Sequence, residues 1–264
     1  MPPLAADATL PQPSMPPLAA AVLPHPPLLV PELAGTATAE LDPLRTACHQ
    51  ALASVLAAAD LTILIGDGPV WAVPGPSAPG SFRPYGANVE VTLPPLVDLE
   101  LPGLPPPARL DELPLSLAVA AHLLADLDAP PGRLSAVTVP TSLGPGAAAA
   151  IGRALTAGDG VGEVRVGLVA MGDLSACRTE GAPGAFREAA AGFDASVAEA
   201  FRTGKPERLL DLDPTPAAEL LVAGRVPLQV LAGACDPAPG WRGQVLYDDA
   251  PYGVGYLVAL LTPP

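Results

Sequence analysis

The chain has 264 residues, half of them apolar, and a mean hydropathy of +0.39, so it can bury a sizeable core. Its net charge of −14 and pI of about 4.4 leave no basic face for nucleic acid or anionic lipid, and no apolar run approaches the ~20 residues of a membrane helix. Three cysteines are too few for a disulfide framework, and residues 1–14 lack the Lys or Arg of a signal peptide, so we expect a soluble cytoplasmic protein.

The first elements of the fold are predicted to begin after a leader. Residues 1–15 are expected to be a disordered or misassigned leader, and residues 16–264 a single domain. A buried strand is predicted at Leu18–Leu23, and a second one at Leu61–Gly66. Between them, apolar residues recur at steps of three and four over Thr36–Ala59, which predicts a helix.

The rest of the chain continues this alternation after a stretch rich in Pro and Gly. That stretch, residues 72–110, holds one predicted strand at Asn88–Leu93. Helices are then predicted at Leu113–Leu127, Gly144–Ala157, Gly184–Arg202, Pro206–Leu212, Thr215–Ala223 and Pro227–Cys235, and strands at Leu134–Val139, Glu163–Met171, Gly243–Tyr247 and Gly253–Leu261. Buried strands that alternate with amphipathic helices indicate an α/β fold, a single three-layer domain with a mostly parallel central sheet flanked by helices.

Three polar residues follow predicted strands, where ligands of such sheets bind. His25 lies between prolines that restrict its backbone, which suits a ligand of fixed orientation, although a lone histidine more often caps a strand or occupies a surface turn. Asp67 and Asp173 each follow a glycine at a strand end. Either carboxylate could bind a metal or another cation, or could instead close an Asx-turn.

Other polar residues offer weaker signals. Asp248 and Asp249 are adjacent carboxylates that repel each other, so at least one should find a donor, a cation or solvent. His49 and His122 are placed on helix faces away from the apolar stripes and are expected to be solvated, whereas Cys48 is expected to be a packed thiol. Dinucleotide-binding, phosphate-loop, nucleophile-elbow and H-E-x-x-H zinc motifs are absent from the sequence.

Three ordered motifs resemble the class III extradiol ring-cleavage dioxygenases. PHPPLLVPELAG (Pro24–Gly35) is similar to the opening motif of their catalytic subunits and of the related Memo-type proteins. GDLSACRTEGAPGAF (Gly172–Phe186) resembles their GDLSH-type segment, and the FD of Gly192–Asp194 also matches. APYGVGYLVA (Ala250–Ala259) resembles their C-terminal motif. The resemblance spans about residues 16–262 and is greatest to an actinobacterial group of proteins similar to the catalytic subunit of these dioxygenases.

The resemblance implies a metal site in altered form. Active members hold ferrous iron with two histidines and a glutamate, which leaves positions open for catechol and oxygen. His25 matches the first histidine, Asp67 stands where the second is expected, and Asp249 is the best counterpart of the glutamate. This set of His25, Asp67 and Asp249 would favour Mn, Mg or Ca over Fe(II), and the alternative is that no metal binds.

The acid–base histidine implied after GDLS is replaced by Ala176, which cannot transfer a proton. Asp173 and Cys177 are the remaining catalytic candidates there, with Cys177 one position out of register.

Two functions are compatible with these residues. One is a divergent aromatic ring-cleavage oxidoreductase using the three metal candidates. The other is a non-catalytic descendant that binds a small aromatic or other small molecule, or a protein. Nucleic-acid and membrane partners are not expected, and the sequence leaves a homo-oligomer open.

Overall fold

The computed structural model describes residues 17, 19–99, 101, 103–127, 132–157, 164–236 and 240–264. The proposed leader, residues 1–15, lies outside the described residues. The strands are β1 (Ala19–Leu23), β2 (Leu61–Gly68), β3 (Ala72–Pro74), β4 (Pro79–Ser81), β5 (Glu90–Thr92), β6 (Ala108–Leu110), β7 (Arg133–Pro140), β8 (Val166–Met171), β9 (Arg242–Asp249) and β10 (Tyr256–Thr262).

The helices connect these strands. The α-helices are α1 (Pro31–Ala34), α2 (Asp42–Ala58), α3 (Leu115–Ala125), α4 (Pro145–Thr156), α5 (Ala189–Arg202), α6 (Pro214–Glu219) and α7 (Arg225–Ala234). Short 3₁₀ helices are η1 (Pro27–Leu29), η2 (Gly35–Ala37), η3 (Ala39–Leu41), η4 (Arg83–Tyr85) and η5 (Pro206–Asp211). None of the helices in the described ranges combines the length and apolar character that a membrane span needs.

Within the described part of the chain, eight strands form one central sheet in the order β6-β3-β7-β2-β8-β1-β10-β9. The four inner strands β7, β2, β8 and β1 are parallel, and β10 and β9 continue the sheet in antiparallel pairing. At the other edge β3 and β6 are parallel to each other, and β3 is antiparallel to β7. The expected α/β fold with a mostly parallel sheet is therefore confirmed.

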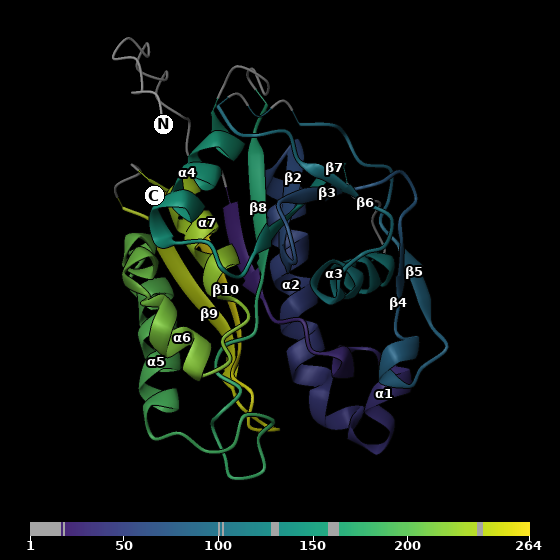
Figure 1. Ribbon diagram of the computed structural model, residues 1–264, viewed down its shortest axis with the longest axis vertical. Coiled ribbons are helices and arrows are strands. Elements are labelled where there is room, and N and C mark those ends of the chain that lie inside the picture. Colours follow the sequence, from purple (N-terminus) through teal and green to yellow (C-terminus); the bar gives the residue numbers. More distant parts are fainter. Residues whose placement is uncertain are drawn as a thin grey trace, which may run out of the picture.

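Helices cover both faces of the sheet (Figure 1). One apolar cluster joins α2 and α3 to one face, with Leu52 and Leu117 fully buried. Another joins α4, α5 and α7 to the opposite face, with Phe201 and Leu231 fully buried. Because β1, β2 and β8 are buried on both faces, their sequences are almost wholly apolar, which is the pattern that predicted these strands.

Helix α3 lies under a further layer, the two-stranded sheet of β4 and β5. A Cβ added at Gly80 would lie 2.7 Å from the Cβ of Ala118, so the two layers are in close contact there. The strands β3, β4 and β6 have three residues each and were missed in the stretch rich in Pro and Gly, because so short a strand carries almost no periodic signal.

Two predicted helices begin later than expected. Helix α2 begins at Asp42, with Pro43 in its first turn, where a missing N–H costs nothing. Helix α5 begins at Ala189, because Ala185 takes a left-handed conformation with φ of 58° and ends any helical continuity from Gly184. These differences change the ends of the elements and leave their order intact.

Candidate functional site

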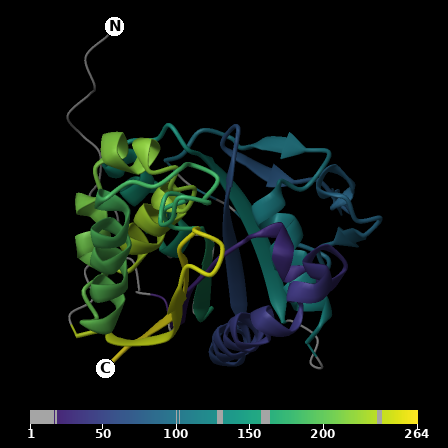
Figure 2. The same ribbon diagram turned by 90° about the horizontal axis from the view of Figure 1, so that it is seen from below.

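The three sequence motifs meet at the carboxyl edge of the parallel strands. The backbone N–H of His25, after β1, donates a hydrogen bond to the Asp173 carboxylate, after β8, at 2.7 Å. In the same region Leu174 donates to the Gly255 carbonyl at 2.9 Å, and Gly255 donates to the Ser175 carbonyl at 2.8 Å. Figures 1 and 2 show this arrangement, with the yellow β9–β10 turn beside the green loop that follows β8.

The His25 side chain faces Asp67. Its Nε2 atom is 3.7 Å from Oδ1 of Asp67, too long for a hydrogen bond but close enough for charge pairing when the imidazole is protonated. The side chain of His25 is 6% exposed and that of Asp67 is 25% exposed. The Nδ1 atom of His25 is buried without a hydrogen-bond partner among the described residues. Solvent therefore reaches this pair mainly from the Asp67 side.

Asp173 is a partly buried carboxylate that orients the His25 backbone. Burial raises the pKa of Asp173, and the nearby Asp67 carboxylate raises it further, while His25 acts in the opposite direction through its charge and its backbone N–H. Burial and then the charge of Asp173 also raise the pKa of Cys48 and of Tyr256. The ionised form of Asp173 thus makes the local electrostatic potential negative.

Tyr256 is a member of this region that the sequence analysis did not single out. The residue is 2% exposed, and its position on β10 pairs with Asp249 on β9. The position could have been found from the C-terminal motif, which contains Tyr256. Its raised pKa keeps the phenol neutral, so it can act only as a hydrogen-bonding group at neutral pH.

The structure brings His25 and Asp67 together but does not add Asp249 to form a metal site. Asp249 lies on β9, separated from β1 by β10, and its carboxylate accepts the N–H of Ala250 at 2.7 Å. Among the residues that the structure describes, no three His, Cys, Asp or Glu side chains are grouped so that they could hold a metal ion. The residues present therefore do not fit the three-ligand set that ferrous iron uses in the resembling enzymes.

The segment that follows Asp173 is held by contacts within the protein. Asp194, 1% exposed, accepts the Ser175 N–H at 2.9 Å and pairs with Arg178 at 2.9 Å. Cys177 is fully buried, and its thiol lies 3.5 Å from the Gly184 carbonyl oxygen. Ala176 has no side chain that can move a proton. The residues here stabilise the loop and do not supply a visible acid–base group.

His49 and His122 were expected to be solvated, and this prediction is wrong, because their side chains are only 29% and 13% exposed. Both Nε2 atoms are buried without a hydrogen-bond partner among the described residues, and they lie 3.9 and 3.8 Å from the same Oδ2 atom of Asp126. For His122 the reason is Phe82, the residue directly after β4, which packs edge-on against the His122 ring. Cys48 is fully buried, which confirms that it is a packed thiol.

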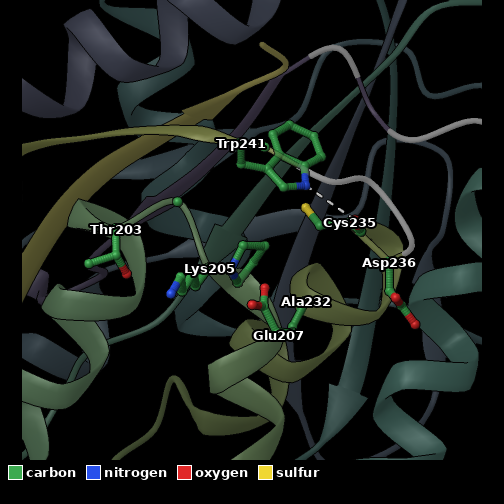
Figure 3. Close-up of a pocket in the computed structure, with 10 residues that line it drawn as sticks. Thr203, Lys205, Glu207, Ala232, Cys235, Asp236 and Trp241 are labelled. Atoms are coloured by element: carbon green, nitrogen blue, oxygen red, sulfur yellow. Dashed lines mark hydrogen bonds between the residues drawn. The ribbon is translucent and has the colours of Figure 1, made fainter.

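A cavity of about 540 Å³ lies at the opposite end of the sheet, beside the start of β9 (Figure 3). Trp241 and Cys235 form part of its wall, and the indole N–H of Trp241 donates to the Cys235 carbonyl at 3.2 Å. Lys205 and Glu207 contribute charged groups to its lining. None of the lining residues belongs to the three motifs, so the cavity gives no support to the site at the carboxyl edge.

Comparison with known proteins supports the fold alone. No protein-family model and no curated protein matches the chain. The solved structure of the uncharacterized protein JW3007 from Escherichia coli K12 matches with a TM-score of 0.54 and 14% sequence identity. The match covers 93% of this chain and 99% of that one. The chain therefore resembles a known structure in its fold over most of its length.

Proposed function

We propose that this chain is a class III extradiol dioxygenase-like protein that does not cleave catechols and instead binds a small ligand at the carboxyl edge of its sheet. The observation that carries the proposal is the incomplete ligand set, in which His25 and Asp67 meet at 3.7 Å without a third metal-binding side chain among the described residues. The three motifs support the relationship, since they contact one another directly around Asp173.

The residue at position 176 gives separate support for the loss of ring cleavage. General acid–base catalysis contributes about 10²–10⁴-fold to a reaction, and Ala176 cannot provide it. Cys177 is no replacement, because its thiol is fully buried and faces the backbone carbonyl of Gly184. Metal binding and proton transfer are thus both impaired, and restoring one of them is not enough.

The chemistry of the site favours a neutral ligand with hydroxyl groups. Asp67 is the more exposed member of the pair, and its carboxylate accepts hydrogen bonds. The same Asp67 carboxylate repels an anionic ligand. A small aromatic molecule with phenolic hydroxyls meets both conditions. A cytoplasmic location fits three free, buried cysteines.

The test of lost ring cleavage uses absorbance. The protein is incubated with Fe(II) without oxygen, catechol is added, and the ring-opened product is followed after air is admitted. We expect no turnover above the iron-only blank for the parent or for Asp67→His. Asp67→His combined with Ala176→His should also stay at the blank, because Asp249 still lies outside the site and the third metal ligand is still lacking among the described residues. Steady turnover by the unmodified protein contradicts the proposal.

The test of ligand binding uses calorimetry with catechol as the probe and without added metal. A hydrogen bond to a charged group contributes about 1.5–3 kcal/mol, so Asp67→Asn should weaken binding roughly tenfold or more. Asp249→Asn is the matched control and should bind catechol as the parent does, because Asp249 is bonded to the following backbone N–H. Equal affinity of Asp67→Asn and the parent, or no binding by the parent, contradicts the proposal.

A further inference from the structure

A second cavity, of about 590 Å³, lies at the β3–β6 edge of the sheet, away from the three motifs. Its walls come from the end of β3, the segment that follows it, the segment after β5 and the start of the chain leading to α3. A smaller cavity of about 250 Å³ adjoins it, and the two share Pro74, Leu96, Asp98 and Arg109 in their linings. The volume of the larger one suits a small organic molecule.

Arg109 is positioned between the two cavities by two hydrogen bonds. One terminal nitrogen donates to the Pro74 carbonyl at 3.3 Å, and the other donates to Oδ1 of Asp98 at 2.8 Å. These bonds use two of the five N–H groups of a guanidinium. The side chains are 55% and 85% exposed, so the Arg109–Asp98 ion pair is a weak surface pair that an incoming anion can replace.

Much of the remaining wall is apolar and rich in proline, and Ser77 and Thr92 are its uncharged polar members. Leu93, Leu96 and Leu113 line it, and the prolines are Pro74, Pro76, Pro94 and Pro95. Proline has no backbone N–H, so these positions offer no donors, and the Arg109 guanidinium is the charged donor of the lining. Proline also restricts the unbound backbone, which lowers the entropic cost of binding a ligand.

We propose that this cavity binds a small apolar molecule carrying one negative charge, with the anionic group on Arg109 and the apolar body against the proline-rich wall. A monoanion is favoured over a doubly charged phosphate for two reasons. Asp98 remains close to the anionic group, and the whole chain carries a net charge of −14. The site is independent of the His25–Asp67 pair, so its test and the test of the proposed function can fail separately.

The experiment compares two fluorescent probes with the same apolar body. Anilinonaphthalene sulfonate carries one negative charge, and N-phenyl-1-naphthylamine carries none. Saturable binding of the sulfonate by the native protein is expected, with Arg109→Gln raising its Kd about tenfold or more. Asp98→Asn is expected to lower that Kd about threefold, because it removes the carboxylate that competes for Arg109. The neutral probe should bind the parent and Arg109→Gln equally.

The control is Arg165→Gln, which removes an equally exposed arginine that pairs with an aspartate, Asp60, outside the linings of these two cavities. It should bind both probes as the parent does. Three results overturn the proposal. The first is that the native protein does not bind the sulfonate. The second is that Arg109→Gln and Arg165→Gln weaken sulfonate binding equally. The third is that Arg109→Gln loses the charged and the neutral probe equally, because such a result would indicate only a structural change.

Discussion

Asp173, at a strand end, and Asp194, in helix α5, both accept hydrogen bonds from backbone N–H groups. Asp173 accepts the backbone N–H of His25, and Asp194 accepts that of Ser175 while pairing with Arg178. The sequence allowed a cation site or an Asx-turn for Asp173, but its partner is 148 residues away. Local sequence holds no information on such a partner, so the position of Asp173 could be predicted and its contact could not.

His49 gives a pH-dependent prediction. Burial lowers the pKa of His49, Asp126 opposes this, and His122 and Arg45 lower it further. Because the folded-state pKa is below the unfolded value of about 6.5, the unfolded chain takes up the proton first. The contribution of His49 to stability is therefore complete above pH 6.5 and is lost as the pH falls below it. We expect the Tm of His49→Gln to fall less than that of the parent between pH 7 and pH 5.

Thermal unfolding followed by circular dichroism at both pH values checks this prediction, and His25→Gln serves as the comparison variant at a histidine outside α2 and α3. An identical fall in Tm for His49→Gln and the parent contradicts it. The apolar stripe of α2 predicted a solvated His49. It could not show that α3 packs beside α2 and brings Asp126 to 3.9 Å from the buried Nε2 atom of His49.

Helices α4 and α7 are packed through glycines. A Cβ added at Gly152 of α4 would overlap the Val230 carbonyl, and one added at Gly233 of α7 would overlap the backbone of Ala149. The two helices therefore approach each other closely enough that backbone meets backbone. The periodicity of apolar residues predicted both helices. In a sequence, however, a glycine within a helix indicates only weak helix propensity, so the close contact between α4 and α7 could not be predicted from the sequence.

Gly152 and Gly192 form a matched pair for testing this packing. Gly192 of α5 is exposed, and no atom of another described element lies within 4 Å of an added Cβ. Gly192→Ala should stabilise the protein by about 1 kcal/mol, raising Tm by roughly 2–4 °C, through helix propensity alone. Gly152→Ala gains the same propensity but forces the helices apart, at a cost of about 3 kcal/mol and roughly 6–12 °C. Calorimetry measures both, and a stabilised Gly152→Ala contradicts the packing described.

At the scale of the molecule, the order of strands and helices was predictable, and the assembly of the site was predictable only in part. Continuous apolar runs identified β2 and β8, and both lie inside the sheet as expected. Strand-end positions correctly placed His25 near Asp67. The order of strands across the sheet depends on pairings between distant segments, so the position of β9 beyond β10, and with it that of Asp249, did not follow from the sequence.

Each of the three apolar clusters formed by the described residues contains one cysteine. Cys48 belongs to the cluster under α2 and α3, Cys235 to the cluster under α4, α5 and α7, and Cys177 to a small cluster beside the GDLS segment. All three thiols are free and at most 2% exposed, so an alkylating reagent can reach each one only when its own cluster opens.

Timed alkylation followed by peptide mass spectrometry therefore measures the opening of each cluster separately in the unmodified protein. Cys177 should be modified first, because its cluster contains the fewest buried residues. Cys48 and Cys235 should follow at similar rates. The central sheet contributes to both larger clusters, so both are expected to open when the sheet separates from its helices in one unfolding event. Modification of Cys48 before Cys177 contradicts this order. The three natural cysteines thus report separately on the local opening of the three apolar clusters.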